Sequence, residues 1–255
     1  MEPSDPKDQI PCLASGDRGA WSLGSKFILK DRNSNPPVHE AATTTFVKEN
    51  TIIPVPGIAK EWTDGTRHFI LAERVPGETL EKVWSKITEE KREELAKETA
   101  EYISQLRQFH SPKIQSVNRQ PLHNAFLLGG DSYTVHGPFS TQDELWDTMV
   151  ANFKDVPDEV AALWKERMPS PLPWTLAHAD LTNCNIMVDP ETFKLTGIID
   201  WETSGYFPVW WEYVGAMFGF GSNDAEWKGL LRKYMPDYSG ALGWFRDIYH
   251  LSHGF

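Results

Sequence analysis

The sequence predicts an α+β fold with two lobes: a small antiparallel β lobe over residues 1–75 and a larger, mostly helical lobe over residues 76–255. Residues 57–62 and 68–73 have strand-forming compositions and are separated by T-D-G-T, which predicts a β-hairpin. The V-P-G-E-T-L segment, residues 75–80, contains helix breakers and predicts the crossing between the lobes. Beyond it, apolar side chains recur every three or four residues, as they do in helices.

The segments before this hairpin complete the predicted small lobe. Residues 1–20 mix Pro, Gly, Asp and Ser without periodicity, which predicts an irregular lead-in. A turn at residues 23–24 precedes a predicted strand at 26–30, and a short helix is predicted to start near Glu40. The proline-rich segment 52–56 predicts an extended linker, because proline interrupts both helices and central strands.

The predicted large lobe begins with a long helix. Glu89 and Glu90 follow Thr88, and acidic side chains favour the first turn of a helix. One face of this helix is predicted to hold Leu95, Thr99, Tyr102, Ile103, Leu106 and His110, with Pro112 ending it. Residues 113–140 are predicted to be loops, and further helices are expected over residues 142–153, 157–167, 224–234 and 241–251.

The composition narrows the class of protein. Hydrophobic residues make up 40% of the 255 residues and charged residues 24%, which is enough apolar material for a packed core. The formal net charge of −11 argues against a nucleic-acid or anionic-membrane partner and is compatible with a neutral or cationic small substrate as well as with a solvated acidic surface. Two cysteines exclude a disulfide framework, and neither a signal peptide nor a membrane span is recognisable. We therefore expect a cytoplasmic enzyme or binding protein, of unknown oligomeric state.

One stretch, residues 176–213, concentrates the polar residues that could carry chemistry. His178, Asp180 and Asn185 form the pattern H-x-D-x-x-x-x-N, and a following apolar run ends at Asp200. Phosphoryl transfer from a nucleotide requires a carboxylate for the acceptor hydroxyl, oxygen ligands for Mg²⁺ and cations for the phosphates. Asp180 is the candidate base, and Asn185 and Asp200 are candidate oxygen ligands.

Each of these residues also has a simpler structural interpretation. Asp180 alone could be a loop or cap aspartate, and His178 is more readily a structural histidine than a base. Asp200 is harder to explain structurally, because a carboxylate at the end of an apolar strand is costly unless it is bound. Trp201 fits packing better than ligand stacking, and Cys184 has no neighbour that would lower its pKa.

The stretch resembles the catalytic segment of the aminoglycoside phosphotransferase family, a branch of the protein-kinase-like fold. The strings WSLGSKFILKDR, IPVP, HFILAERVPGE and GIIDWETSGYFPVWWEY are similar to fungal-type members of that family. The resemblance extends over roughly residues 20–220. It implies a bilobal protein-kinase-like fold that binds ATP and Mg²⁺ and transfers the γ-phosphoryl group to a small-molecule hydroxyl or amine.

The resemblance also implies a role for particular residues. Asp180 corresponds to the catalytic aspartate, and His178 to the histidine that shapes the catalytic loop. Asn185 and Asp200 correspond to the metal ligands, and Lys30 and Glu40 to the phosphate-binding lysine and its helix partner. Residues from Glu73 to Val75 would present backbone groups to the purine. The weaker candidates for the acceptor site are Glu202, Glu212 and Trp201.

Two features favour an alternative, a kinase-fold protein that binds a ligand or partner, or uses the cleft for another reaction, without transferring phosphate. Ala179 stands where the family usually has Gly, a residue chosen where the backbone needs freedom. In addition, little chain precedes Lys30, which predicts a shortened small lobe without two full strands before that lysine. Such a shortened lobe would weaken nucleotide binding.

Overall fold

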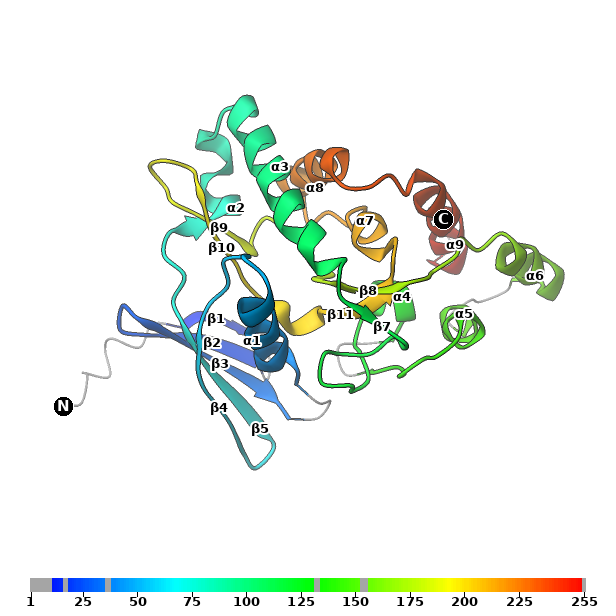
Figure 1. Cartoon of the computed structure of the whole chain (residues 1–255), viewed down its shortest axis with the longest axis horizontal. Helices are drawn as coiled ribbons and strands as arrows, with labels where there is room; N and C mark the ends of the chain where they lie inside the picture. The colour runs from blue at the N-terminus through cyan, green and yellow to red at the C-terminus, as the bar shows by residue number, and fades with distance from the viewer. Residues whose placement is uncertain (1–10, 16–17, 35–37, 131–133, 152–155, 254–255) are drawn as a thin grey trace.

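The computed structural model describes residues 11–15, 18–34, 38–130, 134–151 and 156–253. The fold is α+β, with a five-stranded sheet on one side and a mostly helical region on the other (Figure 1). All five strands are antiparallel to their neighbours, in the order β1-β2-β3-β5-β4. They are β1 (Pro11–Ser15), β2 (Arg18–Leu23), β3 (Phe27–Asn33), β4 (Ile58–Asp64) and β5 (Arg67–Glu73).

The start of the chain differs from its prediction. Residues 1–20 were expected to be irregular, but β1 and the first part of β2 lie there, while residues 1–10 are outside the described residues. The expectation that two strands could not precede Lys30 is also wrong. Strands of 5 and 6 residues suffice, because β2 pairs with the longer β3 and β1 extends the sheet by pairing with β2. The pairing register, rather than an alternating pattern, determines these two strands.

Helix α1 (Glu40–Asn50) begins where the sequence predicted, and Figure 1 shows it beside the sheet. The hydroxyls of Thr43 and Thr44 donate to the carbonyls of His39 and Glu40, four residues earlier, within its first turns. The helix contacts the 3-10 turn η3 (Trp201–Thr203) that follows Asp200. Helix α1 therefore connects the sheet to the segment that the sequence marked as catalytic.

After the crossing at residues 75–77, the short strand β6 (Glu78–Thr79) joins a second sheet, in the order β10-β9-β6. Strands β9 (Ile186–Val188) and β10 (Leu195–Ile198) flank the site.

Helix α3 (Glu89–Leu106) begins as predicted, with Thr88 accepting a hydrogen bond from the Lys91 N–H at 3.4 Å. It ends before His110, which lies in strand β7 (His110–Ser111) and pairs with β8 (Trp174–Ala177), so the predicted helical position of His110 is wrong. Pairing with a strand some 60 residues away overrides the local periodicity.

The remaining elements surround the site. They are α2 (Leu80–Val83), η2 (Trp84–Lys86), α4 (Ala125–Leu128), α5 (Gln142–Val150), α6 (Asp158–Glu166), β11 (Gly205–Pro208), α7 (Trp211–Gly215), α8 (Ser222–Tyr234) and α9 (Ser239–His253). Helices α5, α6, α8 and α9 lie close to their predicted positions, although α5 ends at Val150 and residues 152–153 of its predicted span are outside the described residues. No helix in the described part of the chain is long and apolar enough to cross a membrane.

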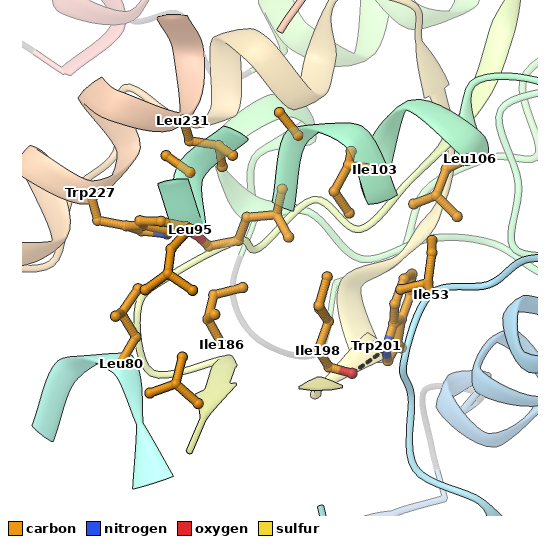
Figure 2. Close-up of a cluster of buried hydrophobic side chains, with 14 of the residues drawn as sticks. Ile53, Leu80, Leu95, Ile103, Leu106, Ile186, Ile198, Trp201, Trp227 and Leu231 are labelled. Atoms are coloured by element: carbon orange, nitrogen blue, oxygen red, sulfur yellow. Dashed lines mark hydrogen bonds between the residues drawn. The ribbon is translucent and has the colours of Figure 1, made fainter. Parts of the chain in front are cut away.

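Two hydrophobic cores support the site. In the first, α3 and α8 pack on β9 and β10, and the side chains of Leu95, Trp227, Ile186 and Ile198 converge (Figure 2). Trp201 belongs to this core, and its indole N–H donates to the Ile198 carbonyl at 3.0 Å. The second core is rich in tryptophan and includes Trp174, Trp210, Trp211 and Trp244. Much of the high tryptophan content is therefore used for packing.

Candidate active site

His178 holds the loop between β8 and β9 in shape. Its ring is fully buried; Nε2–H donates to the Ile199 carbonyl at 3.1 Å, and Nδ1 accepts from the Asp180 N–H at 3.2 Å. These partners define a neutral ring with its proton on Nε2. Burial lowers the pKa of His178 to about 4, so the ring stays neutral near pH 7. This geometry suits a positioning group better than a base.

Asp180 and Asn185 contact each other within this loop. The Asn185 amide nitrogen donates to the Asp180 backbone carbonyl and to the carboxylate Oδ2, both at 2.9 Å. The backbone carbonyl of Asn185 accepts from the Ile199 N–H at 3.0 Å, which ties the loop to the turn that carries Asp200. Burial raises the pKa of Asp180 to about 6, against the opposing charge of Lys228. The side-chain hydrogen bonds among the described residues leave Asp180 Oδ1 available.

Asp200 follows β10 in the left-handed conformation, with φ 66° and ψ 63°. Non-glycine residues adopt this region at a cost, and such residues gather at functional sites. Its Oδ1 accepts from the Lys30 ammonium at 2.7 Å, and the same ammonium donates to Glu40. Burial alone would raise the pKa of Asp200, but the charge and hydrogen bond of Lys30 outweigh it and lower the pKa to about 2. The structure thus brings together three predicted residues from the sheet, α1 and the catalytic segment.

Glu202 lies beside this cluster and faces the sheet. Its Oε2 accepts from Arg32 Nε at 3.1 Å and from Arg18 Nη2 at 2.6 Å. Carboxylate oxygens of Glu40, Asp200 and Glu202 lie within 4.8 Å of one another, an arrangement able to hold a cation. The sequence placed Glu202 at the acceptor site, whereas its partners here come from β2 and β3.

Glu212 supports the loop that carries Asp180. Its Oε2 accepts from the His178 N–H at 2.6 Å and its Oε1 from the Ala179 N–H at 3.1 Å. Ala179 is left-handed, with φ 66°, so it keeps the backbone shape that a glycine would adopt without strain. Burial raises the pKa of Glu212 to about 7, while these two N–H groups act to lower it. Because both oxygens accept from backbone N–H groups, Glu212 positions the loop.

Trp201 is not placed to contact a substrate. Its side chain has no exposed surface, and its ring packs edge-on against His178, with 4.5 Å between ring centroids. The candidate role of Trp201 in acceptor binding is therefore corrected to packing behind the catalytic loop.

Glu73 and Val75 lie at the edge of the sheet where the chain crosses over. The Glu73 carboxylate is exposed and accepts from the Gly57 N–H at 3.1 Å. The N–H groups of Glu73 and Arg74 donate to the carbonyls of Gly57 and Lys26. Val75 packs closely on Gly197 of β10. A Cβ atom added to Gly197 would lie 2.6 Å from the Cγ1 methyl carbon of Val75. Among the backbone hydrogen bonds of the described residues, none uses the Val75 N–H.

The sequence analysis missed a buried ion pair at the start of α8. Asp224 accepts from the Asn183 N–H at 2.8 Å and from the Phe220 N–H at 2.9 Å, and it lies 3.1 Å from the Lys228 ammonium. Lys228 also donates to the Phe218 carbonyl at 2.6 Å. The Asp-x-x-x-Lys spacing in the predicted helix 224–234 was the available signal, but such pairs are usually exposed. This pair joins α8 to the loop that carries Asp180.

A pocket opens next to Asp180. Its walls include Ala179, Leu181, Glu212 and Lys228 together with aromatic side chains of Phe126, Trp211, Phe218 and Phe220. The aromatic residues come from α4, α7 and the segment before α8, and sequence reasoning did not predict them. The pocket places an apolar surface beside the candidate base.

The antiparallel sheet, the Lys30–Glu40–Asp200 cluster and the loop holding Asp180 define a kinase-like phosphotransferase fold. The chain belongs to the phosphotransferase enzyme family, whose model matches residues 18–244. A search of curated proteins finds no match.

Solved structures share this fold. The chain is similar to an aminoglycoside-3'-phosphotransferase of type VIII, with 16% identity, a TM-score of 0.59, and 95% of this chain and 94% of that chain covered. It is also similar to APH(2")-IIa in a ternary complex with streptomycin and ATP. The identity is 14% and the TM-score 0.58, and the match covers 94% of this chain and 80% of that chain. For APH(3'')-Id from Streptomyces rimosus in complex with ADP and streptomycin, the identity is 12% and the TM-score 0.58. That match covers 98% of this chain and 95% of the other chain.

Proposed function

We propose that the protein is a small-molecule kinase that transfers the γ-phosphoryl group of ATP to an acceptor hydroxyl with the help of Mg²⁺. The observation that carries the proposal is the pair of contacts made by Lys30, which bridges Glu40 on α1 and Asp200 in the catalytic segment. A buried lysine between two carboxylates stays charged. It is thus prepared to bind the phosphates of a nucleotide.

The nucleotide would lie between the sheet and the catalytic segment. The Val75 N–H, which donates to no backbone carbonyl of the described residues, is suited to the purine edge, next to Glu73, and Lys30 is suited to the phosphates. Asp200 and Asn185 offer the carboxylate and amide oxygens that Mg²⁺ prefers, and the backbone bond between Asn185 and Ile199 keeps their two segments together. When bound, the ion would neutralise negative charge on the phosphates.

In the proposed reaction, the acceptor oxygen forms a bond to the γ-phosphorus while the bond from that phosphorus to the ADP oxygen breaks. The acceptor proton passes to Asp180 Oδ1, which the loop leaves available. Asn185 and His178 hold the Asp180 carboxylate and backbone in position. Most of the catalytic effect comes from positioning and charge stabilisation.

The structure weakens the two sequence-based arguments for a non-catalytic protein, namely the short chain before Lys30 and the alanine at position 179. The small sheet has strands β1 and β2 before β3, and Ala179 retains the left-handed conformation. The comparison with complexes of streptomycin and nucleotides supports a small-molecule acceptor. A cytoplasmic location remains a prediction from the sequence.

Thermal unfolding with Mg-ATP and Mg-ADP tests the proposal directly. Nucleotide that binds the folded state raises the melting temperature through mass action. Asp200→Ala should remove both the magnesium dependence of this shift and any phosphoryl transfer, because the site loses an anionic ligand. No shift in the wild-type protein at millimolar nucleotide, or unchanged magnesium-dependent activity in Asp200→Ala, would contradict the proposal.

A further inference from the structure

Two arginines lie side by side on the face of the five-stranded sheet that carries Lys30. In the β2–β3 ladder Gly19 lies opposite Asp31, so Arg18 and Arg32, one position further along each strand, fall next to each other. Side chains alternate along a strand, which places Arg32 and Lys30 on one face and Arg18 with them. Like charges in opposite positions of a sheet repel each other, so a negative group between the two arginines stabilises this arrangement.

Glu202 supplies that negative group, and it holds the two arginines unequally. Its Oε2 accepts from Arg18 Nη2 at 2.6 Å and from Arg32 Nε at 3.1 Å. The Arg32 side chain is 12% exposed, and its Nη1 also donates to the carbonyls of Gly19 and Asp31. The Arg18 side chain is 45% exposed, and among the described residues its one side-chain hydrogen bond is the contact with Glu202. Arg18 can therefore leave Glu202 while Arg32 still neutralises that carboxylate.

Glu202 lies next to the residues proposed to bind the phosphates. Carboxylate oxygens of Glu202, Asp200 and Glu40 lie within 4.8 Å of one another, and Asp200 Oδ1 accepts from the Lys30 ammonium at 2.7 Å. Lys30 and the two arginines match these three carboxylates in charge. A triphosphate brings further negative charge, of which Mg²⁺ neutralises a part. An arginine that turns towards the phosphates would neutralise more of it, because a guanidinium binds phosphate oxygens through two parallel hydrogen bonds.

We infer that Arg18 is a nucleotide-binding residue whose guanidinium moves from Glu202 to the phosphate oxygens of Mg-ATP, while Arg32 stays paired with Glu202. This inference rests on the proposed function for the identity of the ligand. Exposed ion pairs contribute little free energy, so little stabilisation is lost when the contact between Arg18 and Glu202 breaks. The guanidinium then exchanges a carboxylate oxygen for phosphate oxygens, which are also charged acceptors. Glu202 is a positioning residue that holds Arg18 beside the site.

Isothermal titration calorimetry with Mg-ATP and with adenosine tests the role of Arg18. Arg18→Ala should weaken Mg-ATP binding about tenfold and leave adenosine binding within about twofold of wild type, because adenosine has no phosphate. Arg18→Lys keeps the charge without the guanidinium and should recover part of the loss. Mg-ATP binding by Arg18→Ala that equals wild type, or an equal loss for Mg-ATP and adenosine, would overturn the inference.

The matched control is Lys60→Ala, which also removes one exposed positive charge from the sheet. Lys60 lies opposite Leu71, and Leu71 lies opposite Leu29, the residue before Lys30. Lys60 is therefore on the face of the sheet away from Lys30. Lys60→Ala should bind Mg-ATP like the wild type. A loss equal to that of Arg18→Ala would assign the effect to net charge and overturn the inference.

Glu202→Gln distinguishes phosphate binding by Arg18 from a purely structural contact. If Arg18 binds phosphate, this substitution releases the guanidinium and removes a competing anion, so Mg-ATP should bind as tightly as to wild type or more tightly. If the contact only holds the sheet against the catalytic segment, Glu202→Gln and Arg18→Ala break the same contact and should weaken Mg-ATP binding equally. That result would overturn the inference. A wild-type protein that does not bind Mg-ATP would instead contradict the kinase proposal, so the two failures are distinct.

Discussion

At the scale of single residues, Asp180 combines a fixed position with an unusual proton affinity. In Asp180→Asn, an amide oxygen replaces Oδ2 and can still accept from Asn185, so folding and nucleotide binding should persist. Turnover should fall by roughly two to four orders of magnitude, because the amide cannot accept the acceptor proton. Steady-state assays of ATP consumption, beside thermal unfolding, measure both effects. Equal turnover of any acceptor by the two proteins would remove Asp180 from the mechanism.

The pH dependence of the wild-type enzyme follows from the same residue. Burial raises the pKa of Asp180 to about 6, and the base must be deprotonated to act. We therefore expect kcat/KM to decrease as the pH falls through about 6, and to be nearly level between pH 7 and 8. A profile for the residual activity of Asp180→Asn should lack this limb. A wild-type limb near the ordinary aspartate value would show that the carboxyl is not buried as described.

Ala179 is a second residue whose conformation has a measurable consequence. A left-handed alanine costs about 1–2 kcal/mol, of which glycine recovers part after its own entropy loss of about 0.5–1 kcal/mol. Ala179→Gly should therefore raise the free energy of unfolding by up to about 1 kcal/mol, measured by urea denaturation. The matched control, Ala162→Gly in exposed α6, should lower it by about 0.5–1 kcal/mol. Destabilisation by both substitutions would contradict the left-handed conformation.

At the scale of elements, Glu212 on α7 determines how the loop after β8 is held. Glu212→Gln replaces one of two accepting oxygens with an NH₂ group that faces a backbone N–H. Leaving a buried donor without an acceptor costs about 1–3 kcal/mol, so urea denaturation should show that loss. Turnover should fall as well, because Glu212 holds the loop that carries Asp180. Unchanged stability would indicate that the backbone groups find other partners.

At the scale of the whole molecule, ion pairs connect the five-stranded sheet to the catalytic segment. Glu202 pairs with Arg32, which is mostly buried, and with Arg18, whose side chain is 45% exposed. Glu202→Gln should cost roughly 1–2 kcal/mol of unfolding free energy, between the ~0–1 of exposed pairs and the ~3–5 of buried ones. Urea denaturation at low and high salt should show a smaller loss at high salt, because the exposed Arg18 contact is screened. A loss that is the same at both salt concentrations would assign the effect to the buried Arg32 contact alone.

Local sequence was sufficient to predict several features of the fold and of the candidate site. The spacing of His178, Asp180 and Asn185 marks a loop between two short strands, and the structure brings Asp180 and Asn185 into contact within it. The start of α1 at Glu40 and the Thr88 cap of α3 were also predictable. In each case neighbouring residues determine the conformation through propensity, capping or hydrogen bonds over a few positions.

The remaining features of the fold and of the candidate site were determined only by the tertiary structure. Strand β2 depends on its pairing with β3, and β1 on its pairing with β2. His110 leaves the helical pattern because β8 offers a pairing partner. Glu212 became a loop-positioning residue and Trp201 a core residue because of segments that fold against them. The aromatic pocket gathers Phe126 and Phe220 from positions almost 100 residues apart. No local sequence pattern predicts that these side chains lie together. Packing between elements that are distant in the sequence determines which side chains line a pocket and which carboxylate oxygens accept no hydrogen bond from the chain.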